Sequence, residues 1–486
     1  MSNQDPLPLV EGITREYLLH HRLCPRELSP EGNVRVSAAP DALLDGVDEI
    51  AYAYGRPVLV APAPASEVEQ MIERLWSRSE RAVELAAVRE DDMATDVRDL
   101  ANQPPVIRYV NLLVRDAYDA GASDIHLEAG RTGLAARFRL DGVLTPAPEP
   151  PAELHHAVVS RIKLLAELDI AERRRPQDGR IRVRLEAREL DLRVSTVPTY
   201  FGESLVLRLL DRGGRPVGLG ELGMPSAVLD RMESLARRPH GMVLVTGPTG
   251  SGKTTTLYAA LGLRDTMAEK VVTVEDPVEY QLNGVAQVPV HRQAGVTFGA
   301  ALRSILRQDP DVVMVGEMRD TETAEVAVQA AMTGHLVFST LHTNDAVAAI
   351  PRLLDLGVPD YLVGATLDAV LAQRLVRRVC GGCAEEYRPA RDGVARMGAG
   401  LPAPSRFIRG AGCPLCRGTG YRGRLGVFEL LQMDDALRDA VVRRAPRSEL
   451  RDLAAVAGME PMRVDAWRKV DRGLTTVEEV LRVVQE

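Results

Sequence analysis

Glycine, lysine and threonine residues spaced for phosphate binding lie at 247–256, in the segment GPTGSGKTTT. The segment follows an apolar run, MVLVT, at 242–246, and it fits the pattern G-x-x-x-x-G-K-[ST]. In that pattern the glycines let successive backbone N–H groups turn toward phosphate oxygens, and a helix beginning near Lys253 adds the positive end of its dipole. Lys253 is also one of only four lysines in the chain. The pattern predicts a site for a nucleoside triphosphate.

Two residues at the end of this loop have specific expected roles in binding ATP. Lys253 would neutralise the β- and γ-phosphates, and the Thr254 hydroxyl would complete the coordination shell of a bound Mg²⁺. The whole expected binding loop comprises Gly247, Pro248, Thr249, Gly250, Ser251, Gly252, Lys253, Thr254 and Thr255.

Two acidic segments follow further along the chain. In LRQDPDVVMVGEMRD (306–320), Glu317 comes just after an apolar strand-like run, and we expect it to be the general base that polarises the attacking water. Gly316 stands where many P-loop enzymes have a metal-binding aspartate, so Mg²⁺ would be held through water or by another carboxylate. The segment VVTVEDPVEY (271–280) offers Glu275, Asp276 and Glu279 to orient Mg²⁺ or water, although an acidic helix cap would read the same.

Histidines and arginines complete the polar candidates. His335 and His342 lie at the two ends of an apolar strand in TGHLVFSTLHTNDA (333–346), where they would sense the γ-phosphate or serve a purely structural role. Arginines crowd the strands predicted around 180–210. Most of them are expected on a solvated, ion-paired sheet face, and one or two could instead reach a neighbouring subunit's triphosphate as arginine fingers.

Four of the five cysteines form two C-x-x-C pairs, Cys380/Cys383 and Cys413/Cys416. In a chain that reads as cytosolic, such pairs indicate metal binding more than disulfides. The spacing within each pair suits tetrahedral thiolate coordination of Zn²⁺, and the site would be closed and structural. Two unrelated pairs of reduced cysteines are the alternative.

The composition of the whole chain narrows the function classes. Of its 486 residues 45% are apolar and 26% charged, which is ordinary for a globular protein, and the net charge of −8 argues against a uniformly basic nucleic-acid binder. No apolar run approaches the ~20 residues that span a bilayer. The start of the chain lacks a basic n-region and an apolar h-region. These features favour a cytoplasmic protein.

Patterning divides the chain into three domains. We expect an N-terminal domain over 1–95, including a helical segment at 66–85, and an acidic linker at 90–99. An α+β domain over 100–218 would combine a helix from Val106 with strands of alternating arginine and apolar residues. Over 222–486, alternating apolar strands and helices predict a mostly parallel α/β sheet, with the tetracysteine subdomain inserted at 378–420.

Taken together, these motifs resemble the secretion ATPase superfamily, which drives type II secretion, type IV pilus assembly and DNA uptake. The P-loop, the acidic "Asp box" (VVTVEDPVEY), the Walker B segment and the "His box" (TGHLVFSTLHTNDA) occur in the family's order. The stretches ASDIHLE (122–128), LDIAERRRPQDGRI (168–181), DLRVST (191–196) and GYRGRLGVFELL (420–431) match as well, so the resemblance covers roughly residues 100–486.

The resemblance implies a RecA-like core, a PAS-like second domain and a hexamer. It also implies roles for individual residues: Glu317, Lys253, Glu275 and His342 in catalysis, and Asp276, Glu279 and His335 in the nucleotide site. Arg193 and Arg208 fall where the family places fingers acting on a neighbouring site. The tetracysteine element resembles the assembly and secretion branch and is lacking in the retraction branch. An N-terminal region of about a hundred residues fits the type II secretion ATPase, because pilus-extension ATPases usually carry a longer or doubled one.

The implied protein is a cytoplasmic ATP hydrolase that requires Mg²⁺ and binds structural Zn²⁺. It would act peripherally at the inner membrane without inserting, and without nucleic acid. Residues 1–95 would dock to a membrane anchor protein, and the ring would move a polytopic platform protein to assemble a pseudopilus. A pilus-assembly or DNA-uptake motor is one alternative. The other is a nucleotide-gated scaffold or nucleic-acid-binding module with little turnover.

Overall fold

The computed structural model describes residues 13, 15–29, 32–69, 71–72, 104–185, 188–211 and 217–484. Contacts within the chain separate two compact units, Met1–Pro105 and Val106–Glu486. Of the helix predicted over 66–85, only 66–69 and 71–72 are described, and they are helical. The linker predicted over 90–99 lies outside the described residues.

The N-terminal unit is a small α/β fold. Its described elements are α1 (Arg15–His21), β1 (Leu23–Leu28), β2 (Val34–Ala38), α2 (Gly46–Tyr54) and β3 (Val58–Pro62). The strands form one sheet in the order β1-β2-β3, with β1 antiparallel and β3 parallel to β2. Leu18, Leu23, Val34, Val36 and Ile50 belong to its core and are fully buried.

Residues 104–211 form helices against an antiparallel sheet, as the arginine–apolar alternation predicts. The elements are α5 (Pro104–Asp119), β4 (Asp124–Ala129), β5 (Leu134–Leu140), β6 (Val143–Pro146), α6 (His155–Leu165), β7 (Gln177–Leu185), β8 (Arg188–Thr199) and β9 (Gly202–Asp211). The sheet order is β6-β5-β4-β9-β8-β7. Because side chains alternate along a strand, the pairings Arg180↔Arg193 and Arg193↔Arg208 place three arginines side by side on one face.

The remaining residues build a mostly parallel sheet in the order β12-β11-β13-β14-β10-β15-β18. Its strands are β10 (Gly241–Thr246), β11 (Val271–Glu275), β12 (Ala286–Pro289), β13 (Val312–Val315), β14 (Leu336–Leu341), β15 (Leu367–Val379) and β18 (Tyr421–Gln432). Only β18 among them runs antiparallel to its neighbour, β15. The helices are α7 (Ser226–Ala236), α8 (Lys253–Leu261), α9 (Phe298–Ile305), α10 (Thr321–Met332), α11 (Ala349–Asp355), α12 (Asp360–Thr366), α14 (Asp435–Val442), α15 (Arg447–Val456), α16 (Met462–Asp471) and α17 (Val477–Val483).

The central strands are buried on both faces, which explains their unbroken apolar runs. Met242 and Leu244 of β10 belong to the hydrophobic core on one face, packed with α9 and α10. Val243 and Val245 belong to the core on the other face, packed with α7 and α8. This sandwich fixes β10 rigidly, and the carboxyl end of β10 is where the glycine-rich loop begins.

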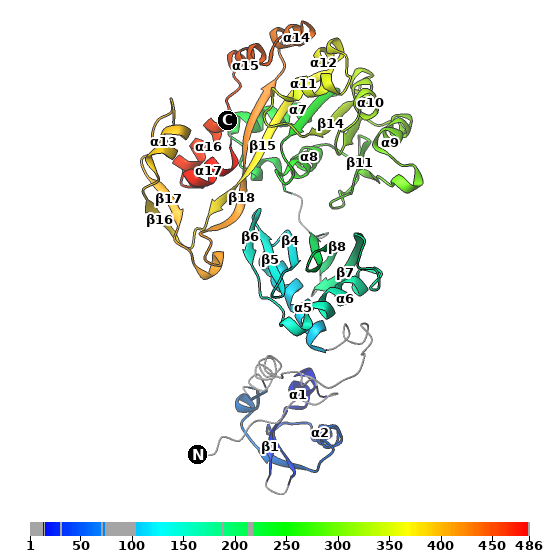
Figure 1. Cartoon of the computed structure of the whole chain (residues 1–486), viewed down its shortest axis with the longest axis vertical. Coiled ribbons are helices and arrows are strands. Elements are labelled where there is room, and N and C mark those ends of the chain that lie inside the picture. Colours follow the sequence, from blue (N-terminus) through cyan, green and yellow to red (C-terminus); the bar gives the residue numbers. More distant parts are fainter. Residues whose placement is uncertain are drawn as a thin grey trace. The chain divides into compact units, whose positions relative to one another are not determined.

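Strands β15 and β18 are paired along most of their length and lead out of the core toward a small two-stranded sheet (Figure 1). That sheet pairs β16 (Ala384–Tyr387) with β17 (Phe407–Gly410), and α13 (Arg391–Met397) lies between them in sequence. The cysteine pairs flank this subdomain, as expected from their positions.

Candidate functional site

The glycine-rich loop has a backbone path that only glycine adopts readily. Gly250 and Gly252 have positive φ angles of 80° and 84°, and Gly247 has φ 153°. A Cβ on Gly247 would also lie 2.4 Å from the backbone oxygen of Gln373. The loop ends where α8 begins at Lys253, so backbone N–H groups and a helix N-terminus converge at one place. This is the expected geometry of a phosphate-binding loop.

Lys253 folds back onto this loop. Its Nζ donates hydrogen bonds to the carbonyl oxygens of Gly247, at 2.8 Å, and Pro248, at 3.1 Å. The pKa of the Lys253 ammonium is lowered to about 8, mainly by burial and to a lesser extent by the charge of Arg374, and the charge of Glu317 opposes both effects. A half-buried cation resting on two carbonyls is poised for an anionic ligand.

Ser251 offers an independent sign of a missing ligand. Its hydroxyl is buried, and it has no hydrogen-bond partner in the described part of the chain. Buried polar atoms almost always have a hydrogen-bond partner. A buried hydroxyl without one, inside a glycine-rich loop, is therefore placed to bond a phosphate oxygen of a bound ligand. Pro248 and Thr249 are exposed on the loop, and Thr254 and Thr255 lie partly buried in the first turn of α8.

Glu317 follows β13 and lies in a small polar cluster. Its Oε2 is 2.6 Å from Nε of Arg319 and 3.5 Å from Nε2 of His342, and its side chain is only 13% exposed. Burial lowers the pKa of His342, the charge of Lys253 lowers it further, and Glu317 raises it. The charge of Glu317 therefore raises the pKa of both Lys253 and His342, and the charge of Lys253 lowers the pKa of His342. The structure brings together a carboxylate, an imidazole and the loop lysine.

Threonines join the strand ends around this cluster. The Thr343 backbone N–H donates to Oγ1 of Thr246 at 2.9 Å, so the loop after β14 is tied to the residue before the P-loop. On the other side, the Thr340 hydroxyl donates to the Gly316 carbonyl at 2.7 Å. The residue before the P-loop and the backbone beside Glu317 are thus both hydrogen-bonded to β14 and the loop that follows it.

Glu275 lies in a different environment from the one expected of a catalytic carboxylate. It is 2% exposed, and its carboxylate accepts hydrogen bonds from Thr273 Oγ1 at 2.6 Å, from Gln287 Nε2 at 3.1 Å and from the Tyr258 hydroxyl. These contacts occupy both oxygens, and none of the described contacts joins Glu275 to Glu317. The geometry indicates that Glu275 holds β11, β12 and α8 together.

Arg193 and Arg208 face the Asp box of their own chain. Burial raises the pKa of Glu279, and the charges of Arg193 and Arg208 lower it. Arg193 is influenced in turn by Glu279 and Asp276, and its Nε is buried without a partner in the described residues. The resemblance implied action on a neighbouring site, whereas this structure places both arginines beside carboxylates of the same subunit.

Two other contacts fix the surroundings of this arginine group. The Arg208 Nε donates to Asp124 Oδ1 at 2.9 Å, which holds that guanidinium against β4. The Oδ2 atom of Asp276 lies 3.4 Å from Nη2 of Arg292.

His335 lies at the opposite end of β14 from the P-loop. Gly241 pairs with Leu336, and Thr246 pairs with Leu341, so His335 precedes the strand ends remote from Gly247. Its Nδ1 is 2.9 Å from the Ala330 carbonyl and closes the end of α10. Within one chain the two histidines of the His box are therefore not brought together.

Strand β15 contributes site residues that the sequence motifs do not include. Gln373 accepts a hydrogen bond from the Thr256 hydroxyl at 2.6 Å, and the next residue, Arg374, donates to the Asn344 carbonyl at 2.9 Å. One strand thus contacts both the P-loop helix and the loop after β14. The segment LAQRLVRRV (371–379) alternates pairs of apolar and polar residues and not single ones, so it lacks the strict period-2 pattern that would have identified this strand in the sequence.

The four paired cysteines meet as a cluster. Their sulfur atoms all lie within 4.8 Å of one another, with Sγ–Sγ distances of 3.8 Å for Cys380–Cys413 and Cys383–Cys416 and 3.7 Å for Cys413–Cys416. Four thiolates placed tetrahedrally about 2.3 Å from one Zn²⁺ would be about 3.8 Å apart. A disulfide needs about 2.05 Å. The cluster has the dimensions of a metal site.

Backbone donors favour thiolate in this cluster. Burial raises the pKa of Cys416, but the N–H groups of Cys413 and Gly420 and the neighbouring thiols outweigh it, and the pKa falls to about 6. The Gly412 N–H also points at Cys383 Sγ, at 3.3 Å, but burial and the three neighbouring thiols raise the pKa of Cys383 to about 12, so the donors favour thiolate at Cys416 first. Donors aimed at sulfur are what a thiolate ligand set requires.

Known proteins share this combination of fold and motifs. A family model described as type II/IV secretion system protein matches residues 99–482. Type II secretion system protein E of Xanthomonas campestris pv. campestris is 46% identical over 99% of this chain and 86% of its own length. The type IV pilus assembly ATPase PilB of Myxococcus xanthus is 42% identical over 97% of this chain and 86% of its own. The crystal structure of the pilus retraction motor PilT with bound ADP has a TM-score of 0.51 and 27% identity, over 76% of this chain and 95% of that chain.

Proposed function

Because the chain belongs to the type II/IV secretion system protein family, we propose that it is an ATP-hydrolysing motor of type II protein secretion. The observation that carries the hydrolytic part is the polar cluster in which Glu317, His342 and Lys253 act on one another's charge beside the phosphate loop. The secretion part is supported by the relative from Xanthomonas, which matches nearly the whole chain.

In the proposed reaction, the loop binds the triphosphate and Glu317 activates water. Lys253 exchanges the carbonyls of Gly247 and Pro248 for phosphate oxygens, and the Ser251 hydroxyl gains a partner. Glu317 then accepts a proton from the water that attacks the γ-phosphorus, and ADP and phosphate leave. His342, whose pKa is lowered, remains neutral at pH 7 and orients the carboxylate.

Mg²⁺ fits the residues present, because a threonine hydroxyl, Thr254, opens α8 directly after the loop lysine. The Thr254 hydroxyl would hold a bound Mg²⁺, which would supply positive charge to the triphosphate. Arg193 and Arg208 would add positive charge from the 104–211 domain of the same chain, with Asp124 holding Arg208 and the charges of Glu279 and Asp276 favouring the charged form of Arg193. Closing that domain onto the core would complete the site and exclude water.

Zn²⁺ fits the four-cysteine cluster by its sulfur spacing and its backbone donors. The metal would fold the subdomain around β16 and β17, which has too few apolar residues to form a core of its own. We assign it a structural role, since four thiolates leave no open position for a substrate.

The working form that we propose is a hexamer bound at the cytoplasmic face of the inner membrane. Among the described residues, no helix combines the length and apolar character needed to cross a bilayer. Residues 1–95 would bind a membrane anchor protein, and motion around the ring would drive a polytopic platform protein. The domain limits 1–95, 100–218 and 222–486 are part of this proposal.

The similarity to the PilB protein of Myxococcus favours a second candidate, a motor for type IV pilus assembly. Replacing the chromosomal gene of the source organism with a Lys253→Ala version separates the two. We expect secreted enzymes to remain inside the cell while surface pili are unchanged. Loss of pili with normal secretion would establish the pilus motor instead. Pull-down with residues 1–95 should correspondingly recover a secretion anchor rather than a pilus anchor.

A further inference from the structure

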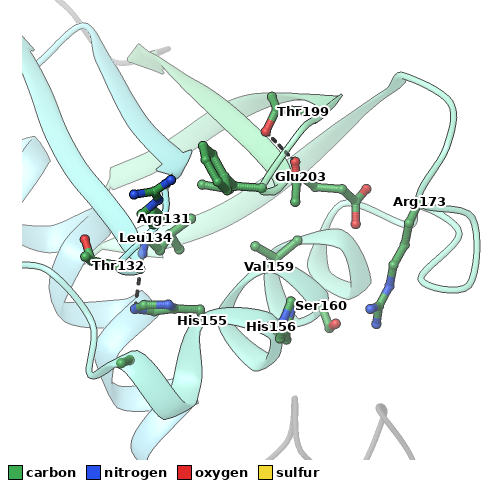
Figure 2. Close-up of a pocket in the computed structure, with 16 residues that line it drawn as sticks. Arg131, Thr132, Leu134, His155, His156, Val159, Ser160, Arg173, Thr199 and Glu203 are labelled. Carbon is green, nitrogen blue, oxygen red and sulfur yellow. Dashed lines mark hydrogen bonds between the residues drawn. The ribbon is translucent and has the colours of Figure 1, made fainter.

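A pocket of about 390 Å³ opens in the 104–211 domain and contains none of the residues assigned to ATP hydrolysis (Figure 2). It lies between the β4–β5 turn, the first turns of α6 and the tip of the β8–β9 hairpin. Such a volume accommodates an organic molecule of moderate size. Because every wall comes from this one domain, the pocket does not depend on how the domain meets the core.

Two unpaired arginines line the pocket from different sides. Figure 2 shows Arg131 near the β4–β5 turn and Arg173 on the far side, beyond Glu203. Neither guanidinium forms an ion pair or a hydrogen bond with any residue that the structure describes. Both side chains are exposed, and two cations without a protein partner at one pocket favour an anionic ligand.

The floor of the pocket holds a buried ion pair. Lys163 Nζ lies 2.7 Å from Glu203 Oε1, and their side chains are 0% and 5% exposed. Lys163 also donates to the Glu172 carbonyl at 2.6 Å, and it does not line the pocket. A buried pair of this kind adds little to stability, but it fixes one carboxylate at the pocket wall. Glu203 Oε2 is thus an acceptor for a hydroxyl or amino group.

Histidine shapes the opposite wall. The His155 Nε2 accepts a hydrogen bond from the Leu134 backbone N–H at 3.2 Å, which leaves its Nδ1–H as a donor (Figure 2). A Cβ on Gly133 would lie 2.2 Å from the His155 ring, so only glycine allows this close packing. Phe201 and Val159 add an apolar wall. The pocket therefore offers cations, a fixed acceptor and an aromatic ring.

We propose that this pocket binds a phosphorylated small molecule of nucleoside-monophosphate size. A single inorganic phosphate cannot fill a volume of about 390 Å³. A ring that packs on Phe201, a phosphate on Arg131 or Arg173 and a hydroxyl or amino group on Glu203 would use three different parts of the lining. The β8–β9 hairpin that lines the pocket also carries Arg193 and Arg208, so its occupant contacts the strands that hold those arginines.

Calorimetric titration of the full-length protein tests this proposal, with its P-loop first saturated by a non-hydrolysable ATP analogue. The probes are GMP, AMP, CMP and UMP, each compared with its nucleoside. We expect at least one monophosphate to bind at one site per chain and its nucleoside to bind at least tenfold more weakly.

The double variant Arg131→Ser/Arg173→Ser should weaken that binding at least tenfold. The matched control is Arg175→Ser, an exposed neighbour in the same loop that does not line the pocket. Equal binding by parent and double variant would overturn the proposal. So would an absence of binding by all four monophosphates, or binding seen only while the P-loop is empty. Each variant replaces an exposed side chain, and circular dichroism checks that it folds.

Discussion

Glu317 is the single residue on which hydrolysis depends in the proposed mechanism. Glu317→Gln keeps the size and the hydrogen bonding to Arg319 Nε but cannot accept the proton from water. We expect ATP to bind within a few-fold of its normal affinity while turnover falls at least 100-fold, as is usual for loss of a general base. Fluorescent-nucleotide titration and phosphate release measure the two effects.

The matched control is Glu325→Gln, which removes an exposed carboxylate on α10 outside the cluster. It should change neither quantity. If Glu317→Gln instead lost nucleotide binding and retained turnover per bound ATP, Glu317 would be a binding residue and not the base.

Lys253 should make ATP affinity depend on pH. Burial and the charge of Arg374 lower its pKa to about 8, and bound phosphates stabilise only the charged form. Affinity is therefore constant well below pH 8 and falls as the pH rises through 8, because the neutral amine must take up a proton on binding. Calorimetry at pH 8 in two buffers with different ionisation enthalpies should detect that uptake.

Lys253→Arg is the control for this titration, since guanidinium stays charged over the whole range. Its affinity should vary little with pH, whatever its absolute value. A parent protein whose proton uptake equals that of Lys253→Arg would contradict the assignment.

Strands β8 and β9 determine whether their arginines act on the nucleotide site of their own chain or on that of a neighbouring subunit. Arg193 faces Glu279 of its own chain, so we expect it to act on the nucleotide bound by that chain. A subunit with Arg193→Ala then lacks the arginine of its site, and a subunit with Glu317→Gln lacks the general base of its site. Mixing the two variants should therefore recover no ATPase activity. Recovery in mixed rings would show that Arg193 acts on the neighbouring subunit, as the family resemblance implies.

The cysteine cluster is expected to stabilise one subdomain without affecting the nucleotide site. Cys380→Ser removes one of four thiolates, so zinc content measured by atomic emission should fall and the melting temperature should drop by several degrees. ATP affinity should be unchanged. Cys24→Ser, which alters a buried thiol in the N-terminal unit, is the control and should leave zinc content untouched. Unchanged zinc in Cys380→Ser would rule out the four-thiolate site.

Local patterns predicted most of the elements that position the site. The strand at 242–246, the glycine turn and the helix from Lys253 are encoded within fifteen residues, because phosphate loops need a fixed local path. Helical spacing alone likewise predicts four of the five buried residues of α5, namely Val106, Val110, Leu113 and Ala117. The α/β class and its parallel sheet were confirmed.

Tertiary contacts decided the rest. The part played by Glu275 depends on Tyr258 and Gln287, which come from separate segments and surround the carboxylate only after folding. Gln373 and Arg374 reach the site because β15 is inserted beside β10, a neighbour relation that no short motif encodes. The family resemblance implies a place for His335 in the nucleotide site, whereas β14, a strand of six residues, separates His335 from His342.

At the scale of the whole molecule, the central proposal is a motor that works as a ring of six. The arginine-bearing domain must close onto the core for hydrolysis, and neighbouring subunits in a ring would hold it there. ATPase activity measured over a range of protein concentrations, in parallel with mass photometry, tests this directly. Specific activity should rise together with the six-subunit species. Activity that is constant with concentration, in a protein that stays monomeric, would contradict the motor.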